Sequence, residues 1–189
     1  MRIISGKFKN KKINFHKNTE TRPLKDSVRE SIFNILKHSS KINFKIENSK
    51  IIDFYAGTGS FGLECLSRKA SHVIFVEKNL NALSNLEKNI DILTLKNQAT
   101  IIKTDVLKFL KNYNFVENID LAFFDPPYKD KGYIDAIKLL KKLNCLSKDH
   151  IILLHREKNS KEDFKKFFKI IENRIYGRSE IFFCKLFLR

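Results

Sequence analysis

A short motif with an acid, two prolines and a tyrosine follows an apolar run in the second half of the chain. The run ends in "LAFFDPPYKD", whose central residues are Asp125, Pro126, Pro127 and Tyr128. Proline lacks an N–H and rarely lies inside a sheet, so the proline pair indicates a rigid exit from a buried strand. The rigidity would aim the groups on either side of it.

The chemistry that suits this motif is methylation of an exocyclic base amine. Such an amine is a poor nucleophile because its lone pair is delocalised into the ring, so two fixed acceptors must hold its hydrogens. The Asp125 carboxylate and the Pro126 carbonyl can be those acceptors, with Pro127 limiting backbone freedom. Tyr128 offers a face for stacking the base, worth roughly 1–3 kcal/mol. This chemistry requires neither a metal nor a covalent enzyme intermediate.

A glycine-rich segment, "DFYAGTGSFGLE", follows an earlier apolar run and precedes a helical pattern. It contains Gly57, Gly59 and Gly62 in G-x-G-x-x-G spacing. That spacing permits a tight turn and close approach of the backbone to a ligand, although a purely structural turn would account for it as well. Its position between a strand and a helix favours a binding loop.

Acidic residues follow the next two apolar runs and indicate a nucleoside ligand. Glu77 comes about 20 residues after Gly57, where an acid accepts hydrogen bonds from ribose hydroxyls. Asp105 could reach an adenine amino group or could cap a helix. These features fit NAD and S-adenosylmethionine equally, but Asp53 beside the loop and the motif at Asp125 favour the cationic sulfonium of S-adenosylmethionine.

The elements that must position these groups alternate along the chain from about Lys50 onward. Continuous apolar runs typical of strands buried on both faces alternate with helical spacing, which predicts a parallel, doubly wound α/β sheet. The last 18 residues predict an antiparallel pair joined near "YGRSE". The predicted strands lie at 50–55, 72–77, 99–104, 119–125 and 150–155, and one helix presents Leu80, Leu83, Leu86, Ile90 and Leu93.

The first 40 residues break that rhythm. "RIISGKFKNKKINF" alternates apolar and basic residues about Gly6, which predicts a small basic hairpin. A helix follows, for which we expect Asp26 or Ser27 as the cap and Glu30 as the partner in an S-x-x-E box. Its apolar face comprises Val28, Ile32, Ile35 and Leu36.

Composition points to a basic globular protein. The 189 residues suffice for one domain, and the formal net charge of +16 favours a nucleic-acid partner, although a Lys-rich proteome would also raise the charge. Three widely spaced cysteines, Cys65, Cys145 and Cys184, indicate reduced core residues rather than a disulfide or zinc framework. The absence of an apolar leader or of a long apolar run leads us to expect a cytoplasmic protein without a membrane span.

Together these motifs resemble the class I S-adenosylmethionine-dependent methyltransferases, and more closely the RsmD-type enzymes that methylate N2 of a guanine in 16S ribosomal RNA. The resemblance rests on "RIISGK", "TRPLKDSVRESIFNIL", "DFYAGTGSFGLECLSR", "VIFVEKN", "DPPY" and a terminal "YG". The segment "RPLKDSVRESIFN" separates this type from amino-methylases that act on DNA or protein.

The resemblance implies a Rossmann-like class I fold with a mostly parallel, seven-stranded sheet and an antiparallel C-terminal strand. It implies one methyltransferase domain over residues 1–189, with a basic hairpin and helix at 1–40 and a catalytic core at 50–189. The implied cofactor is S-adenosylmethionine, and the guanine would be held by the residues from Asp125 to Tyr128. The implied cofactor-binding residues are Asp53, Ala56, Gly57, Gly59, Glu77, Asp105 and Asp125.

The expected partner is 16S ribosomal RNA within an assembling small-subunit particle, bound by a monomer. Phosphate contacts are expected from Lys7, Lys9, Lys11, Lys12, Arg22 and Arg29. Two alternatives remain open at this point. One is an N6-adenine or N4-cytosine DNA methylase, which shares the amine chemistry but would need a target-recognition domain. The other is a non-catalytic, nucleotide-binding RNA assembly factor.

Overall fold

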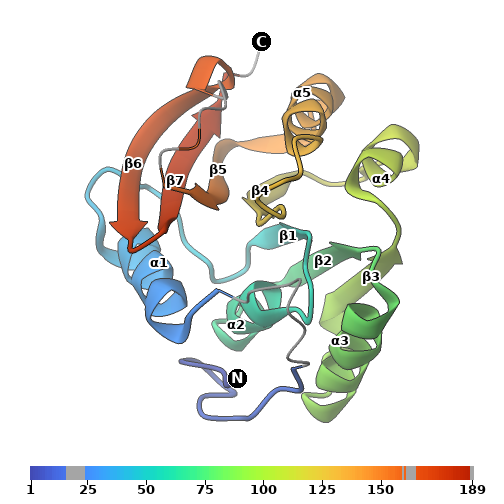
Figure 1. Ribbon diagram of the computed structural model, residues 1–189. Coiled ribbons are helices and arrows are strands. Elements are labelled where there is room, and N and C mark those ends of the chain that lie inside the picture. Colours follow the sequence, from blue (N-terminus) through green and yellow to red (C-terminus); the bar gives the residue numbers. More distant parts are fainter. Residues whose placement is uncertain (16–23, 159, 161–164, 188–189) are drawn as a thin grey trace.

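A seven-stranded sheet forms the centre of the computed structural model, which describes residues 1–15, 24–158, 160 and 165–187 (Figure 1). The strand order is β3-β2-β1-β4-β5-β7-β6. The first five strands pair in parallel and the last two are antiparallel, as the sequence predicts. The strands are β1 (Lys50–Phe54), β2 (His72–Glu77), β3 (Ala99–Lys103), β4 (Ile119–Phe124), β5 (Leu146–Glu157), β6 (Phe168–Tyr176) and β7 (Ser179–Leu186).

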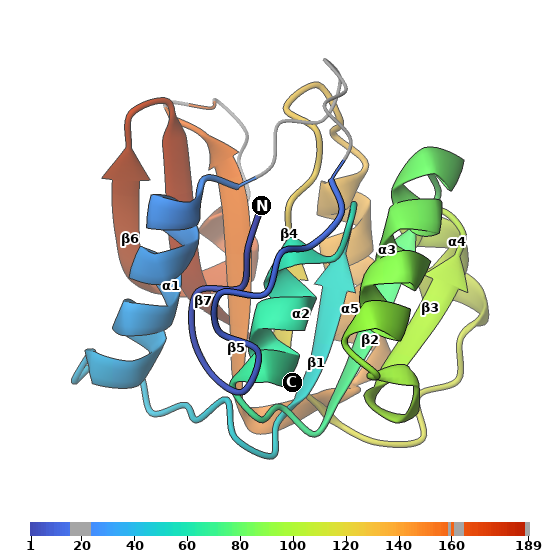
Figure 2. The same cartoon turned by 90° about the horizontal axis from the view of Figure 1, so that it is seen from below.

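Helices cover both faces of this sheet, which confirms the doubly wound α/β class. Helices α1, α2 and α3 lie on one face and α4 and α5 on the other (Figures 1 and 2). Short 3₁₀ turns η1 (Lys96–Gln98) and η2 (Lys165–Phe167) precede β3 and β6. The helices are α1 (Asp26–His38), α2 (Ser60–Ser67), α3 (Leu80–Ile92), α4 (Val106–Asn112) and α5 (Tyr133–Leu143).

Each face of the sheet has its own apolar cluster because the residues of a strand point alternately to the two sides. Ile51 and Phe123 pack toward α1 and α2, whereas Phe54 and Phe124 pack toward α4 and α5. On the first side the ring of Phe61 lies 4.1 Å from that of Phe123, between centroids. This contact fixes α2 against β4. The three cysteines are buried, as predicted.

Three local predictions need correction. The predicted N-terminal hairpin does not form two strands. The segment is a loop that turns back on itself, with a single antiparallel bridge between Arg2 and Lys12. Helix α1 begins at Asp26, and its N-cap Lys25 makes no side-chain cap bond, so the predicted capping box is absent. Leu80 is 78% exposed, because it lies in the first turn of α3 beyond the edge of the core.

The N-terminal loop lies against α2 (Figure 2), where polar groups fix it. The fully buried Glu64 carboxylate accepts hydrogen bonds from the amides of Ile4 (2.7 Å) and Ser5 (3.0 Å). Gly6 has a φ of +82°, and a Cβ there would lie 1.9 Å from the Ser67 carbonyl oxygen. Only glycine therefore allows this close approach. Within the described part of the chain, no helix has the length and apolarity needed to cross a membrane.

Gly62→Ala should destabilise the fold. Replacing a helical glycine with alanine normally stabilises a helix by up to about 1 kcal/mol. Here the new Cβ would lie 2.3 Å from Phe75 Cε1 and 2.8 Å from Val73 Cγ1. Such overpacking costs about 1–3 kcal/mol, so we expect a net fall in the free energy of unfolding, measured by urea denaturation. Ser84→Ala, on the exposed side of α3, is the control and should stay near the wild type. A Gly62→Ala variant as stable as the wild type would contradict the crowding argument.

Candidate active site

The glycine-rich loop joins β1 to α2 at the carboxyl edge of the sheet. Gly57 and Gly59 have φ values of +58° and +83°, in the left-handed region that glycine adopts most readily. A Cβ at Gly59 would lie 2.4 Å from Leu86 Cδ1, whereas one at Gly57 would meet nothing within 4 Å. The Ala56 amide donates to the Val76 carbonyl, which ties the loop to β2. The loop thus rests against α3 and is open above Gly57.

Glu77, at the end of β2, organises this loop. Its carboxylate accepts hydrogen bonds from the amides of Gly57 (2.8 Å), Lys78 (2.8 Å) and Asn79 (2.7 Å). An ionised carboxylate has about four acceptor positions, so one remains for a further donor such as a ribose hydroxyl. The predicted contact of Glu77 with a ribose stays a prediction, and sequence reasoning missed the three amides that orient the carboxylate.

Asp53 lies beneath the loop rather than on its surface. Its carboxylate is almost fully buried and accepts a hydrogen bond of 3.0 Å from the Gly62 amide, at the start of α2. Burial raises the pKa of Asp53 well above its usual value, and the charges of Asp125 and Glu77 raise it further, against the effect of the amide bond. This hydrogen bond fixes the start of α2 under the loop, and the predicted contact of Asp53 with the cofactor stays a prediction.

Asp105 caps α4, which was the alternative reading of its position. Its carboxylate accepts a hydrogen bond from the Leu107 amide (2.9 Å) and lies 3.3 Å from the Lys78 ammonium. Partial burial opposes ionisation, but the amide bond and Lys78 outweigh it, so the pKa of Asp105 is lowered. Contact with adenine stays a prediction.

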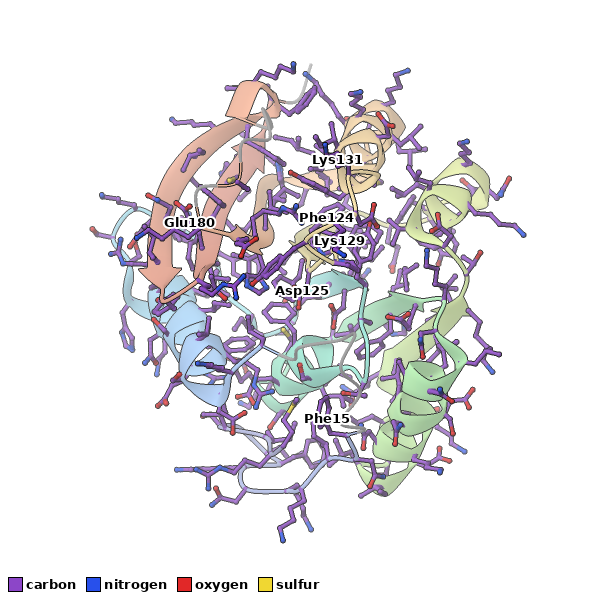
Figure 3. All side chains as sticks on the ribbon, viewed as in Figure 1. Phe15, Phe124, Asp125, Lys129, Lys131 and Glu180 are labelled. Atoms are coloured by element: carbon purple, nitrogen blue, oxygen red, sulfur yellow. The ribbon has the colours of Figure 1, made fainter. Side chains whose placement is uncertain are left out.

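Asp125 follows β4 at the centre of the same edge (Figure 3). Because β4 pairs in parallel with β1, Phe123 lies beside Asp53 and Phe124 beside Phe54. The amide of Asp125 points to the Phe54 carbonyl at 3.4 Å. The motif therefore lies next to the glycine loop, as the sequence analysis expected. Tyr128, three residues on, is 38% exposed and available for stacking.

Two residues that sequence reasoning missed hold this motif, and both lie at the end of β5. His155 Nδ1 is 2.7 Å from Asp125 Oδ1, and both side chains are largely shielded from solvent. The only signal in the sequence is a His-Arg pair that ends the apolar run "IILL", where two polar residues replace the expected apolar ones.

The second missed residue, Arg156, is buried and binds the backbone of the motif. It donates a hydrogen bond of 3.0 Å to the Tyr128 carbonyl and lies 3.4 Å from the carbonyls of Pro126 and Pro127. Its guanidinium also lies 4.5 Å from the centre of the Tyr133 ring. The rigidity that the prolines predict is thus shared with Arg156. The Pro126 carbonyl keeps a second lone pair for a further donor.

The basic residues predicted to bind RNA separate into three groups. Lys7, Lys9, Lys11 and Lys12 are exposed on the N-terminal loop. Arg22 lies outside the described residues. Arg29 was predicted to contact RNA phosphates, which is wrong because it is fully buried in α1, where it donates to the Arg2 carbonyl and to Asp26. Its function is to attach the N-terminus to α1.

Comparison with known proteins agrees with the geometry. A family model described as "Conserved hypothetical protein 95" matches residues 1–185. The ribosomal RNA small subunit methyltransferase D of Haemophilus influenzae is 34% identical over 160 residues, 84% of this chain and 80% of its own. That of Buchnera aphidicola subsp. Acyrthosiphon pisum is 35% identical over 156 residues, 82% of this chain and 78% of its own. The crystal structure of a candidate methylase from Haemophilus influenzae superposes with a TM-score of 0.76 and 30% identity, covering 100% of this chain and 98% of that one.

The free energy of unfolding of Asp53→Asn, relative to that of the wild type, should increase as pH rises. Because the folded pKa of Asp53 is raised, the folded wild type binds more protons than the unfolded chain above pH about 4, and its stability falls with pH until the carboxyl ionises. Asparagine does not ionise, and its carbonyl oxygen still accepts from the Gly62 amide. Urea denaturation at several pH values from about 4 to 8 would measure the difference. A difference independent of pH would contradict the buried, proton-binding state of Asp53.

Proposed function

The chain belongs to the RsmD-type family of methyltransferases, and from this premise we propose that it methylates the exocyclic N2 amine of a guanine in 16S ribosomal RNA during small-subunit assembly. The observation that carries the proposal is the placement of Asp125 and the rigid backbone after it directly beside the glycine loop. A cofactor over the loop and an amine at Asp125 would then be neighbours.

The charges at this edge suit S-adenosylmethionine as the cofactor. Glu77 and Asp125 are acidic, and their charges raise the pKa of the buried Asp53 beside them. Their field favours a cationic sulfonium and ammonium over the pyrophosphate of NAD. The open space above Gly57 leaves room for a ligand against the backbone, and Glu77 keeps an acceptor for a ribose. When bound, S-adenosylmethionine supplies an electrophilic methyl group.

The chain's own residues would bind and orient the amine. Asp125 and the Pro126 carbonyl accept its hydrogens, so that the nitrogen lone pair is directed toward the cofactor side of the site. The face of Tyr128 stacks the base. Arg156 prevents the carbonyls from turning away, because its contacts fix three consecutive backbone units.

The N-terminal loop is proposed to bind the phosphate backbone of the RNA. Glu64 holds its backbone on α2, so the segment that carries the four lysines needs little further backbone ordering on binding. Arg29 is not among the proposed contacts because it is buried.

Asp125→Ala should lower methyl transfer by about 100- to 1000-fold, since it removes one preorganised acceptor. The assay is transfer of a labelled methyl group from S-adenosylmethionine to undermodified small subunits, followed by mass spectrometry of the RNA nucleosides. Asp135→Ala, at an exposed position on α5, is the control and should keep wild-type activity. Full activity in Asp125→Ala would refute the assigned role, and methylated adenine or cytosine in place of N2-methylguanine would refute the guanine assignment.

Reversing the charge at Lys9, Lys11 and Lys12 should weaken RNA binding and its salt dependence together. Each lost phosphate contact lowers the slope of log affinity against log salt by about 0.7–0.9. Filter binding over a series of salt concentrations would measure both quantities. The matched control reverses Lys108, Lys111 and Lys142, which lie on α4 and α5, on the other face of the sheet. Unchanged affinity and slope in the first variant would remove the N-terminal loop from the interface.

A further inference from the structure

We propose that His155 is a positioning residue for the methyl acceptor, because it holds the carboxylate of Asp125 in the orientation that an amine requires. This inference rests on the proposed function and extends it to a residue that does not itself touch the base. It follows from the contacts of His155, from its tautomer and from its place on β5.

His155 lies where β5 passes between Asp125 and the C-terminal hairpin. Leu154 pairs with Phe124 of β4, so the next residues, His155 and Asp125, lie side by side at the end of the two strands. The Nδ1–Oδ1 distance is 2.7 Å, and the histidine side chain is 7% exposed against 25% for the aspartate. On its other side, β5 pairs with β7, where His155 lies opposite Ile181. His155 is therefore fixed from both neighbouring strands.

The contact with Asp125 determines the tautomer. An ionised carboxylate can only accept hydrogen bonds, so the short contact requires the hydrogen on His155 Nδ1. In the neutral ring Nε2 then carries a lone pair, and the Tyr128 hydroxyl lies 3.5 Å from it. The same hydroxyl lies 3.4 Å from Ser179 Oγ, and the Tyr128 and His155 rings meet edge to face at 5.8 Å. One imidazole thus contacts both the acceptor and the stacking residue.

This arrangement divides the two oxygens of Asp125 between two tasks. Oδ1 accepts from His155, which leaves Oδ2 for a hydrogen of the amine. Without His155, a carboxylate that is one-quarter exposed could rotate and bind water instead. Loss of the contact should therefore slow the chemical step, which depends on alignment, and leave binding of S-adenosylmethionine and RNA nearly unchanged.

Three variants of His155 separate the donated hydrogen bond from simple packing. Asparagine places an N–H donor near the position of Nδ1, glutamine places its amide near the position of Nε2, and leucine has no donor. We expect kcat within about threefold of the wild type for His155→Asn, and a fall of about 10- to 100-fold for His155→Gln and His155→Leu. KM for S-adenosylmethionine and for undermodified small subunits should stay within about twofold in all three.

Thermal unfolding of each variant identifies any that fails to fold, and His155→Asn serves as the rescue. The inference is overturned if His155→Leu keeps the wild-type kcat. It is also overturned if the asparagine and leucine variants lose kcat equally while both remain folded, because shape rather than the donor would then matter.

A second measurement does not depend on catalysis. Two-bond ¹H–¹⁵N NMR of the histidine rings reports which nitrogen carries the hydrogen, and His155→Asn assigns the signal. We expect the Nδ1–H form in the wild type and loss of that preference in Asp125→Ala. An Nε2–H form in the wild type would overturn the inference. A wild type with the Nδ1–H form but without guanine methylation would instead refute the proposed function alone.

Discussion

Parallel pairing of β1 with β2 and β4 is the constraint on which the site depends. It brings the carboxyl ends of three strands to one edge, so that Asp53, Glu77 and Asp125, far apart in sequence, interact electrostatically. Continuous apolar strands are needed for this, because both faces of the sheet are covered by helices. The same burial that stabilises the sheet lowers the local dielectric at its edge and strengthens the charges there.

Three ionised acids at one edge would repel one another, and each of the three is stabilised in a different way. Glu77 is surrounded by three backbone amides, and Asp125 has His155. Asp53 accepts a hydrogen bond from a single amide and has a raised pKa, so binding a proton avoids the cost of burying its charge. A cationic ligand would relieve the same repulsion. The overall charge of +16 is therefore reversed locally, with basic side chains on the outside and acidic ones at this edge of the sheet.

Sequence reasoning recovered the sheet, the order of its elements and the placement of Gly57, Glu77 and Asp125, because strand-end residues of a parallel sheet are located by topology alone. It failed where tertiary contacts decide. The burial of Arg29 depends on Arg2 and Met1, which no local pattern connects to α1. The predicted cap of α1 was wrong because sequence patterns locate the first residue of a helix only to within one or two positions.

His155 and Arg156 were missed because their contacts depend on the direction in which each side chain leaves β5. They also depend on the C-terminal hairpin, which holds the end of β5 in place. Successive residues of a strand point to opposite faces. His155 therefore reaches the side chain of Asp125 from one face, while Arg156 reaches the motif's backbone carbonyls from the other. These contacts of His155 and Arg156 require that the backbone at the end of β5 stay fixed. As an edge strand it would fray, but β7 pairs with it through Glu157. The antiparallel strands thus turn the end of β5 into an interior position, and the geometry at Asp125 depends on that pairing.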